Sequence, residues 1–400
     1  MRERACESVR SLVGRMPRVR AIGQWYGGVM KASIFFLLLV VAAGAVGVLG
    51  EDVANSSPLL DVLSFVPASS VSVTVYFTDW TVLKGYVGFD AAFQQSPEDA
   101  ENALTTSLGR GQAAASAFGA NHPDQAALWG WRSSDLQWEA NFTNGTAMPV
   151  YVLKFAAGFQ FGPLVSLFEQ RGFTQTESHA VTVYSHPLDF GVAWLAKSEL
   201  AILNTAVAAE DGLLILSSSS AALDEALSAY RGEIPTLSED AAAQGLAGRL
   251  RGVASAILVI GPGACSILSP DSVLESFIHA SDPQGLYAAL NTLLAERAGL
   301  HVFTAFGVAY RYDGDVPVGT FVLRFLDPAS ANSDLPLRRG LAEFGASTQG
   351  GQPYSQVAFT MTTADVEGSD LTFTVRPIGD EPRRLFQMVL ARDVLFALCP

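Results

Sequence analysis

Apolar and polar side chains alternate along several short segments of the chain, a pattern typical of strands with one buried face. The alternation is strict over residues 71–77 and recurs over 137–142 and 150–155. Asn144-Gly145 lies between the last two runs and favours a hairpin there. Further strands are expected at 180–184, 200–206 and 212–216.

Helices are expected where apolar residues recur at helical spacing and a glycine follows. Residues 98–118 are rich in alanine, and residues 163–171 form a short amphipathic segment that ends before Gly172. The serines at 217–220 offer N-caps to a helix over 221–230.

The second half of the chain repeats this order of elements. Residues 151–155 (YVLKF) match residues 321–325 (FVLRF) in type at an offset of 170. We predict two copies of a β-β-α-β-β-α unit, with chance likeness between two apolar strands as the alternative. The second-half elements are expected at 301–310 and 318–325 (strands), 335–344 (helix), 357–362 and 371–376 (strands) and 382–398 (helix).

Antiparallel hairpins combined with helices predict an α+β fold, in which antiparallel sheets carry helices packed on one face. The first repeat domain is expected to span 59–240 and the second 241–400. Residues 232–248 contain Pro235 and a polar cluster, and they form the best boundary.

One segment near the start predicts export. Residues 32–50 contain no charge, and nineteen such residues can just cross the hydrocarbon core of a bilayer. Residues 1–31 hold seven Lys/Arg against two acids, so this basic N-terminus is expected to stay in the cytoplasm. The tether 51–58 and the domains after it would then lie outside.

The segment 32–50 is interpreted either as a transmembrane anchor or as a signal peptide. Val48 to Gly50 offer small or modest residues of the kind a signal peptidase reads, and Met30 could be the true start of a compact signal. The protein is therefore expected in the cell membrane, single-pass with its C-terminal domain outside, or secreted if the segment is cleaved. The membrane is a partner only in the uncleaved form.

Charge narrows the range of partners. About half of the residues are hydrophobic (49%) and 16% are charged, which suits a folded chain with a large core. Beyond residue 31, eighteen Lys/Arg stand against 37 acids, a net charge of −19. Such an acidic body repels nucleic acid and anionic lipid headgroups.

Three cysteines fit this location. Cys6 lies on the cytoplasmic side, whereas Cys265 and Cys399 lie outside, where disulfides persist. The two can form one disulfide, although the sequence does not show whether they are close enough.

Motifs that carry catalysis are mostly missing. The chain contains no G-x-S-x-G, H-E-x-x-H, C-x-x-C or phosphate-binding loop. His179 and His186 flank one strand, but a metal site would need a third ligand from elsewhere. We therefore assign no catalytic residue, no metal ligand and no cofactor.

The most unusual cluster of side chains is aromatic. Asp79 and Trp80 end the first strand, and Trp129 and Trp131 precede the second. Such aromatics beside acids could line a groove for a sugar or peptide. Packing of the first sheet is the alternative interpretation.

One stretch carries a resemblance. Residues 211–223 form a strand that runs into small capping residues and an alanine-rich helix, and Pro67-Ala68 precede the first strand. In these features residues 58–260 resemble uncharacterised exported bacterial proteins, a group described as domains of unknown function. The resemblance implies an exported α+β fold and transfers no active site to this chain.

The leading hypothesis is a non-catalytic module of the cell envelope that binds a partner protein or an extracytoplasmic ligand. The alternative is an envelope hydrolase whose site is assembled from scattered residues, and a structural spacer is a third possibility. A pocket with a converged nucleophile, base and donor would favour the hydrolase. Because catalytic motifs are mostly missing, the sequence favours a protein that is not an enzyme.

Overall fold

The structure is a computed structural model in which residues 57–69, 71–109, 114, 130–144, 148–186, 205–209, 212–268, 299–347 and 351–400 are described. Ser56–Pro400 form one compact unit, and the fold given below is that of this unit. The segment 32–50 lies outside the described residues. Within the described ranges, no helix combines the length and the apolar character needed to cross a bilayer.

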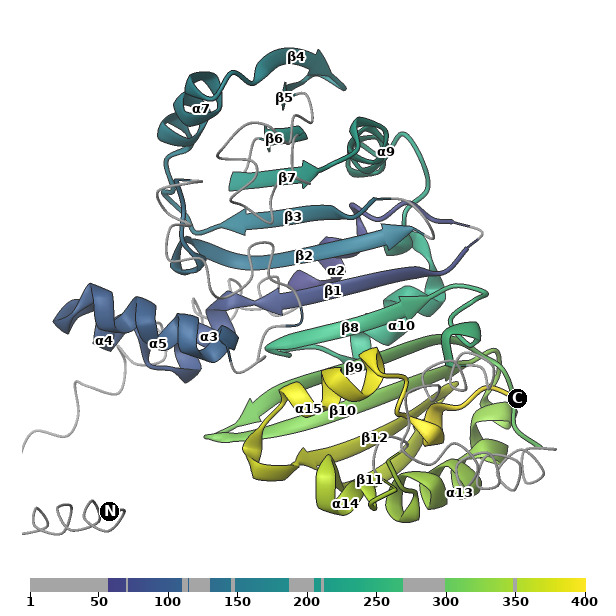
Figure 1. Ribbon diagram of the computed structural model, residues 1–400. Coiled ribbons are helices and arrows are strands. Elements are labelled where there is room, and N and C mark those ends of the chain that lie inside the picture. Colours follow the sequence, from purple (N-terminus) through teal and green to yellow (C-terminus); the bar gives the residue numbers. More distant parts are fainter. Residues whose placement is uncertain are drawn as a thin grey trace, which may run out of the picture. The chain divides into compact units, whose positions relative to one another are not determined.

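A single antiparallel sheet organises the described residues, in the order β11-β12-β10-β9-β8-β1-β2-β3-β7-β6-β5-β4 (Figure 1). The strands are β1 (Val73–Asp79), β2 (Leu136–Asn144), β3 (Val150–Phe155), β4 (Thr174–Ser178), β5 (Val181–Ser185), β6 (Thr205–Ala209), β7 (Leu213–Ser217), β8 (Ser255–Ile260), β9 (Phe303–Asp313), β10 (Val316–Phe325), β11 (Phe359–Glu367) and β12 (Asp370–Pro377).

Helices connect and cover these strands. They are α2 (Pro58–Leu63), α3 (Trp80–Tyr86), α4 (Phe89–Gln95), α5 (Pro97–Gly109), α7 (Phe161–Gln170), α9 (Ser220–Tyr230), α10 (Ala241–Arg249), α13 (Pro328–Phe344), α14 (Tyr354–Val357) and α15 (Arg383–Leu390). Short 3₁₀ turns are η1 (Ser133–Asp135), η4 (Leu237–Glu239), η5 (Ser266–Leu268), η7 (Ile378–Asp380) and η8 (Leu395–Ala397). The predicted α+β class is therefore confirmed.

The pair β1–β8 joins the two halves of the sheet, with Phe77 opposite Ala256. Outward from this pair the order is β1-β2-β3-β7-β6 on one side and β8-β9-β10-β12-β11 on the other. The first five strands of each half follow the same order, and the first half continues with β5 and β4. Duplication of one unit stays a prediction, as does a domain boundary between residues 240 and 241, across which the sheet continues.

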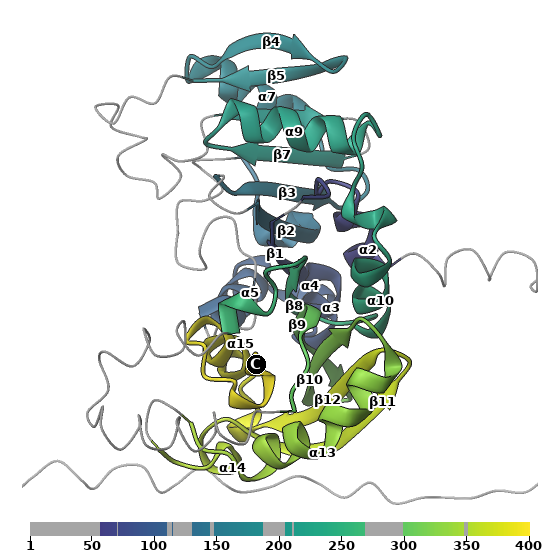
Figure 2. The same cartoon turned by 90° about the vertical axis from the view of Figure 1, so that its right-hand side faces the viewer.

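Both faces of the sheet are covered, rather than the one face expected from the sequence. All six residues of β8 are buried, and successive side chains of a strand point to opposite faces. One core contains Trp80, Val259 and Leu385, and the other contains Leu246 and Leu258. Figure 2 shows α2 and α10 together on one side of the sheet and α15 on the other.

Helix α15 is shorter than the sequence predicts. A helix was expected over 382–398, but α15 ends at Leu390. Arg392 adopts a left-handed backbone (φ 57°), and the Asp393 N–H donates to the Met388 carbonyl at 2.7 Å. This turn ends the helix without a glycine. The C-terminal tail, residues 391–400, then packs against the sheet, where Phe396 contacts Phe321 and Phe373.

Capping explains two further differences from the predicted elements. Helix α13 begins at Pro328, seven residues before its predicted start, because Asp327 accepts a hydrogen bond from the Ser330 N–H at 2.8 Å. Asp240 likewise accepts from the Ala243 N–H at 2.8 Å and caps α10. The polar cluster interpreted as a boundary therefore contains the start of a helix.

Candidate functional site

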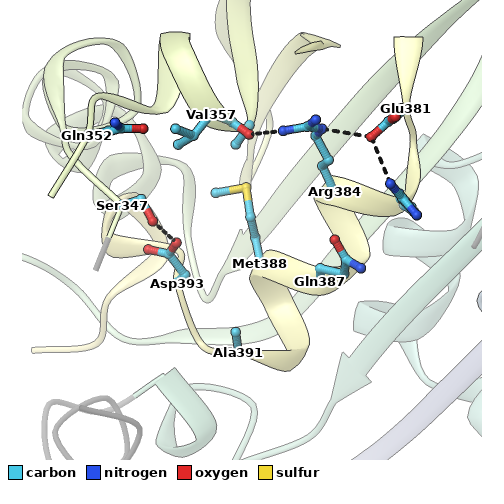
Figure 3. A pocket seen from close by; sticks show the side chains of 11 residues that line it. Ser347, Gln352, Val357, Glu381, Arg384, Gln387, Met388, Ala391 and Asp393 are labelled. Atoms are coloured by element: carbon cyan, nitrogen blue, oxygen red, sulfur yellow. Dashed lines mark hydrogen bonds and ion pairs between the residues drawn. The ribbon is translucent and has the colours of Figure 1, made fainter. Parts of the chain in front are cut away.

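A pocket of about 460 Å³ lies between α15 and the chain that surrounds α14 (Figure 3). Its volume lies within the range of sites for small ligands. The lining residues are Ser347, Gln352, Val357, Ala358, Glu381, Arg383, Arg384, Gln387, Met388, Ala391 and Asp393.

A buried carboxylate forms one end of the pocket. The side chain of Asp393 accepts hydrogen bonds from the Ser347 hydroxyl at 2.5 Å and from the Tyr354 hydroxyl at 3.3 Å. The Leu395 N–H donates to the Tyr354 oxygen at 3.0 Å. Complete burial, followed by the charge of Asp393, raises the pKa of Tyr354 well above its usual value. Tyr354 is therefore a neutral donor that fixes the orientation of Asp393.

Two arginines and one glutamate form the opposite rim. Arg384 donates from Nε to Glu381 at 3.0 Å and from Nη1 to the Val357 carbonyl at 2.7 Å, and Arg383 reaches the same Glu381 oxygen at 3.3 Å. Figure 3 shows Met388 between this rim and Asp393. The rim hydrogen bonds lower the pKa of Glu381. This glutamate is thus ionised and shared by two cations.

The tail that carries Asp393 is held by a disulfide. The structure joins Cys265 to Cys399, whose Cα atoms lie 5.5 Å apart, a normal separation for a bridge. The Cys399 N–H also donates to the Leu268 carbonyl at 3.1 Å. The chain beyond the pocket residue Asp393 is therefore tied covalently to the turn that follows β8, 134 residues before Cys399.

Arg338 of α13 binds the same C-terminal tail through the backbone of Phe396 and Leu398. Its side chain and that of Asp334 are fully buried, and its Nε donates to Asp334 at 2.8 Å. Its Nη1 donates to the Phe396 and Leu398 carbonyls, each at 3.0 Å. Burial lowers the pKa of Arg338, and the hydrogen bond to Asp334 opposes that shift.

The pocket combines polar groups with an apolar floor. Gln352 and Gln387 present amides, Arg383 adds a partly exposed guanidinium, and Met388 supplies apolar surface. Ser347 lies beside a carboxylate, but histidine is not among the lining residues. Among the described residues no group of three or more His, Cys, Asp or Glu is placed to hold a metal. The arrangement suits recognition of a small polar molecule.

The residues that the sequence predicted to line a ligand groove lie away from this pocket. Asp79 caps α3 by accepting from the Val82 N–H at 3.0 Å. Trp80 is fully buried, and Trp131 is 1% exposed and packs edge-on against Phe155 at 6.0 Å. Trp129 lies outside the described residues. Asp79, Trp80 and Trp131 therefore pack within the first half of the sheet and are not among the residues that line this pocket, and their role in binding a ligand stays a prediction.

The pocket residues were not singled out by sequence reasoning. The available signal was the break of the apolar run 385–398 by Arg392 and Asp393. A charged pair inside such a run indicates either a helix end or a buried polar site. The histidines likewise have structural contacts, since His179 lies 2.8 Å from Glu233 and 3.1 Å from Asp224.

Comparisons with known proteins find little. No protein-family model matches the chain. No curated protein matches it either. Among solved structures, the chain is similar to crystal form I of TP0453 at 10% identity and a TM-score of 0.41, over 84% of this chain and 99% of that one.

Proposed function

We propose that the protein is a non-catalytic extracytoplasmic module that binds a small polar ligand in the pocket beside α15. It would be anchored in the membrane by residues 32–50, or secreted if that segment is cleaved. The observation that carries the proposal is the pocket itself, and the Cys265–Cys399 disulfide holds the C-terminal tail that carries its residue Asp393. A disulfide that holds the chain next to the site suits a protein that folds outside the cytoplasm.

Cysteine chemistry supports the location. Disulfides persist in oxidising compartments and are rare in the cytosol. The bridge joins the two cysteines that follow the hydrophobic segment, and Cys6 precedes that segment. Alkylation of intact cells before and after reduction tests this directly. Cys265 and Cys399 should react only after reduction, and their free reaction in untreated cells would contradict the location.

The pocket's lining supports binding rather than turnover. Two amides and a guanidinium can donate to one ligand, and Met388 offers apolar contact. The Ser347 and Asp393 residues are 8% and 5% exposed, and the serine proton already points to the carboxylate. This hydrogen bond is also the observation that keeps a hydrolase as the second candidate. In that case Asp393 would take the proton of Ser347 as it attacks an ester or amide.

Filling the pocket tests the binding function. Ala391→Trp places an indole in the cavity, whereas Leu390→Trp adds the same group to an exposed neighbouring position that is 61% exposed. The full chain in detergent is screened by thermal shift against amino acids, dipeptides and small sugars. We expect stabilising compounds for the unmodified protein and for Leu390→Trp, but not for Ala391→Trp.

The same screen separates the two candidates. A hydrolase predicts release of product from a stabilising ester or amide, lost in Ser347→Ala. A binding module predicts that the compound is recovered intact. Compounds that stabilise the unmodified protein, Leu390→Trp and Ala391→Trp equally would show that the pocket is not the binding site.

A further inference from the structure

Strand β4 is an open edge of the sheet. It pairs only with β5 among the described strands, and Thr174 to Glu177 are exposed. It contains no proline, lysine or bulge, which are devices that block an edge, and Glu177 is its one charged residue. Unpaired backbone donors and acceptors on such an edge can bind another strand.

The opposite edge of the sheet is blocked. Strand β11 has a register shift between Met361 and Thr363, and it carries Asp365 and Glu367. Bulges and charges on an edge oppose pairing with another chain. In the described part of the chain the two edges therefore differ: β4 has no register shift and one charged residue, Glu177, whereas β11 has a register shift and two acids.

The β4–β5 turn decides which backbone groups face outward. Its two residues, His179 and Ala180, both have positive φ (50° and 58°), as in a type I′ hairpin turn. Ser178 and Val181 next to such a turn form a hydrogen-bonded pair, and alternate residues follow the same pattern. Hence Thr174, Thr176 and Ser178 bond inward to β5, whereas Gln175 and Glu177 present their N–H and C=O outward.

The hairpin is held in place before any partner arrives. His179 contacts Glu233 at 2.8 Å and Asp224 at 3.1 Å, and the Ser178 hydroxyl donates to Asp224 at 2.9 Å. Asp224 belongs to α9, and Glu233 follows that helix. A strand fixed in this way loses little freedom on pairing.

The geometry points to a second copy of this chain as the partner, paired antiparallel through β4 about a two-fold axis at Thr176. This register places Gln175 opposite the partner's Glu177, twice, so each amide can donate to a carboxylate. Thr176 lies opposite the partner's Thr176, and Thr174 opposite the partner's Ser178. Both outward-facing residues then form hydrogen-bonded pairs, giving one continuous sheet.

Other symmetric registers are poorer. An axis at Glu177 places two carboxylates directly opposite each other, which is unfavourable. An axis at Gln175 places Glu177 against the partner's Phe173, a residue that is 7% exposed in its own core. The register at Thr176 pairs all five residues of the strand without a like-charge contact.

A residue swap tests the register. In the full chain in detergent, Gln175→Glu places two glutamates opposite two others, and we expect dimer dissociation to become about ten-fold more favourable. The double variant Gln175→Glu/Glu177→Gln has the composition and net charge of the unmodified chain, and its complementary pairs should restore the dimer. Sedimentation velocity over a range of concentrations measures the dimer dissociation of the unmodified chain and of both variants.

Cross-linking gives a second readout that does not depend on the hydrophobic segment. Thr176→Cys should form an intermolecular disulfide, because residues at the axis lie within bridging distance. Thr174→Cys is the matched control on the same face, and its copies would be separated by about 13 Å along the strands. A monomer at all concentrations, equal cross-linking of both variants, or no rescue by the swap would overturn the proposal.

Discussion

The two halves of the sheet fill their interiors differently. Beside β2 and β3 the core is built from aromatic and aliphatic side chains, with Trp80 and Trp131 fully enclosed. Beneath the C-terminal tail, α13 adds the buried charged pair Arg338 and Asp334 to a core that is also aromatic. Both halves are stabilised by buried apolar area, and the second depends in addition on specific polar partners.

The two halves also differ in the hydrogen bonds that their buried donors form, as Trp80 and Arg338 illustrate. The Trp80 indole N–H has no acceptor among the described residues. Arg338 donates to one carboxylate and three backbone carbonyls, and its guanidinium lies over the Phe303 and Phe325 rings. An apolar core tolerates small changes gradually, whereas a buried ion network fails when one member is lost. The tail and the pocket should therefore be the most sensitive part of the molecule.

The largest effect should follow Arg338→Ala. Loss of the guanidinium leaves Asp334 charged, buried and without its main partner, which costs about 3–5 kcal/mol of unfolding free energy. The tail carbonyls of Phe396 and Leu398 lose their donor in the same step. Urea unfolding of the full chain in detergent measures the change.

Arg339→Ala is the matched control, one residue along the same helix. Arg339 is 57% exposed and lies 3.9 Å from Glu343, so its removal should cost at most about 0.5 kcal/mol. Equal losses for the two variants would show that the buried pair contributes no more than a surface pair. The contrast between the halves would then be wrong.

A somewhat smaller loss is expected for Cys399→Ser. The bridge closes a long loop, and its removal should cost about 2–4 kcal/mol, chiefly by freeing the unfolded chain. Reduction of the unmodified protein should give the same shift in unfolding midpoint, and Cys6→Ser should give none. If reduction changes nothing, the disulfide does not hold the tail.

Much of the fold was predictable because its signals are local. Alternation located β1, β2 and β3, and Asn144-Gly145 located the hairpin between the last two. Strand β4 was missed because Thr174 to Ser178 are polar on both faces, as an exposed edge allows. Its turn was hidden as well, since His179 and Ala180 replace the usual glycine or asparagine.

The site was not predictable because its residues meet only through long-range pairing. Asp393 reaches Ser347 across 46 residues, and Cys399 reaches Cys265 across 134. The pairing of β1 with β8, which joins the two halves, likewise depends on the whole sheet. The burial of Trp80 and Trp131 was not predictable for a related reason, since sequence alone does not show which side of a strand end faces solvent.

The smallest effect concerns Asp79, which lies in the apolar half yet carries a charge. Burial raises its pKa above the ordinary 3.8, and the hydrogen bonds from α3 oppose that rise only in part. A carboxyl with a raised folded pKa stabilises most when protonated, so its contribution is full below 3.8 and is lost as pH rises through the folded pKa. Asp79→Asn keeps an oxygen to cap α3 without the charge.

We therefore expect Asp79→Asn to be slightly more stable than the unmodified protein at neutral pH, and the difference to vanish below the ordinary carboxyl pKa. Asp79→Ala should lose about 1 kcal/mol, because the Val82 N–H then has no cap. Urea midpoints of the three proteins across the acid range test both statements. If Asp79→Asn is less stable than the unmodified protein at neutral pH, the charged cap of α3 contributes more to stability than burial of the charge costs. The first half of the sheet would then also depend on a paired charge.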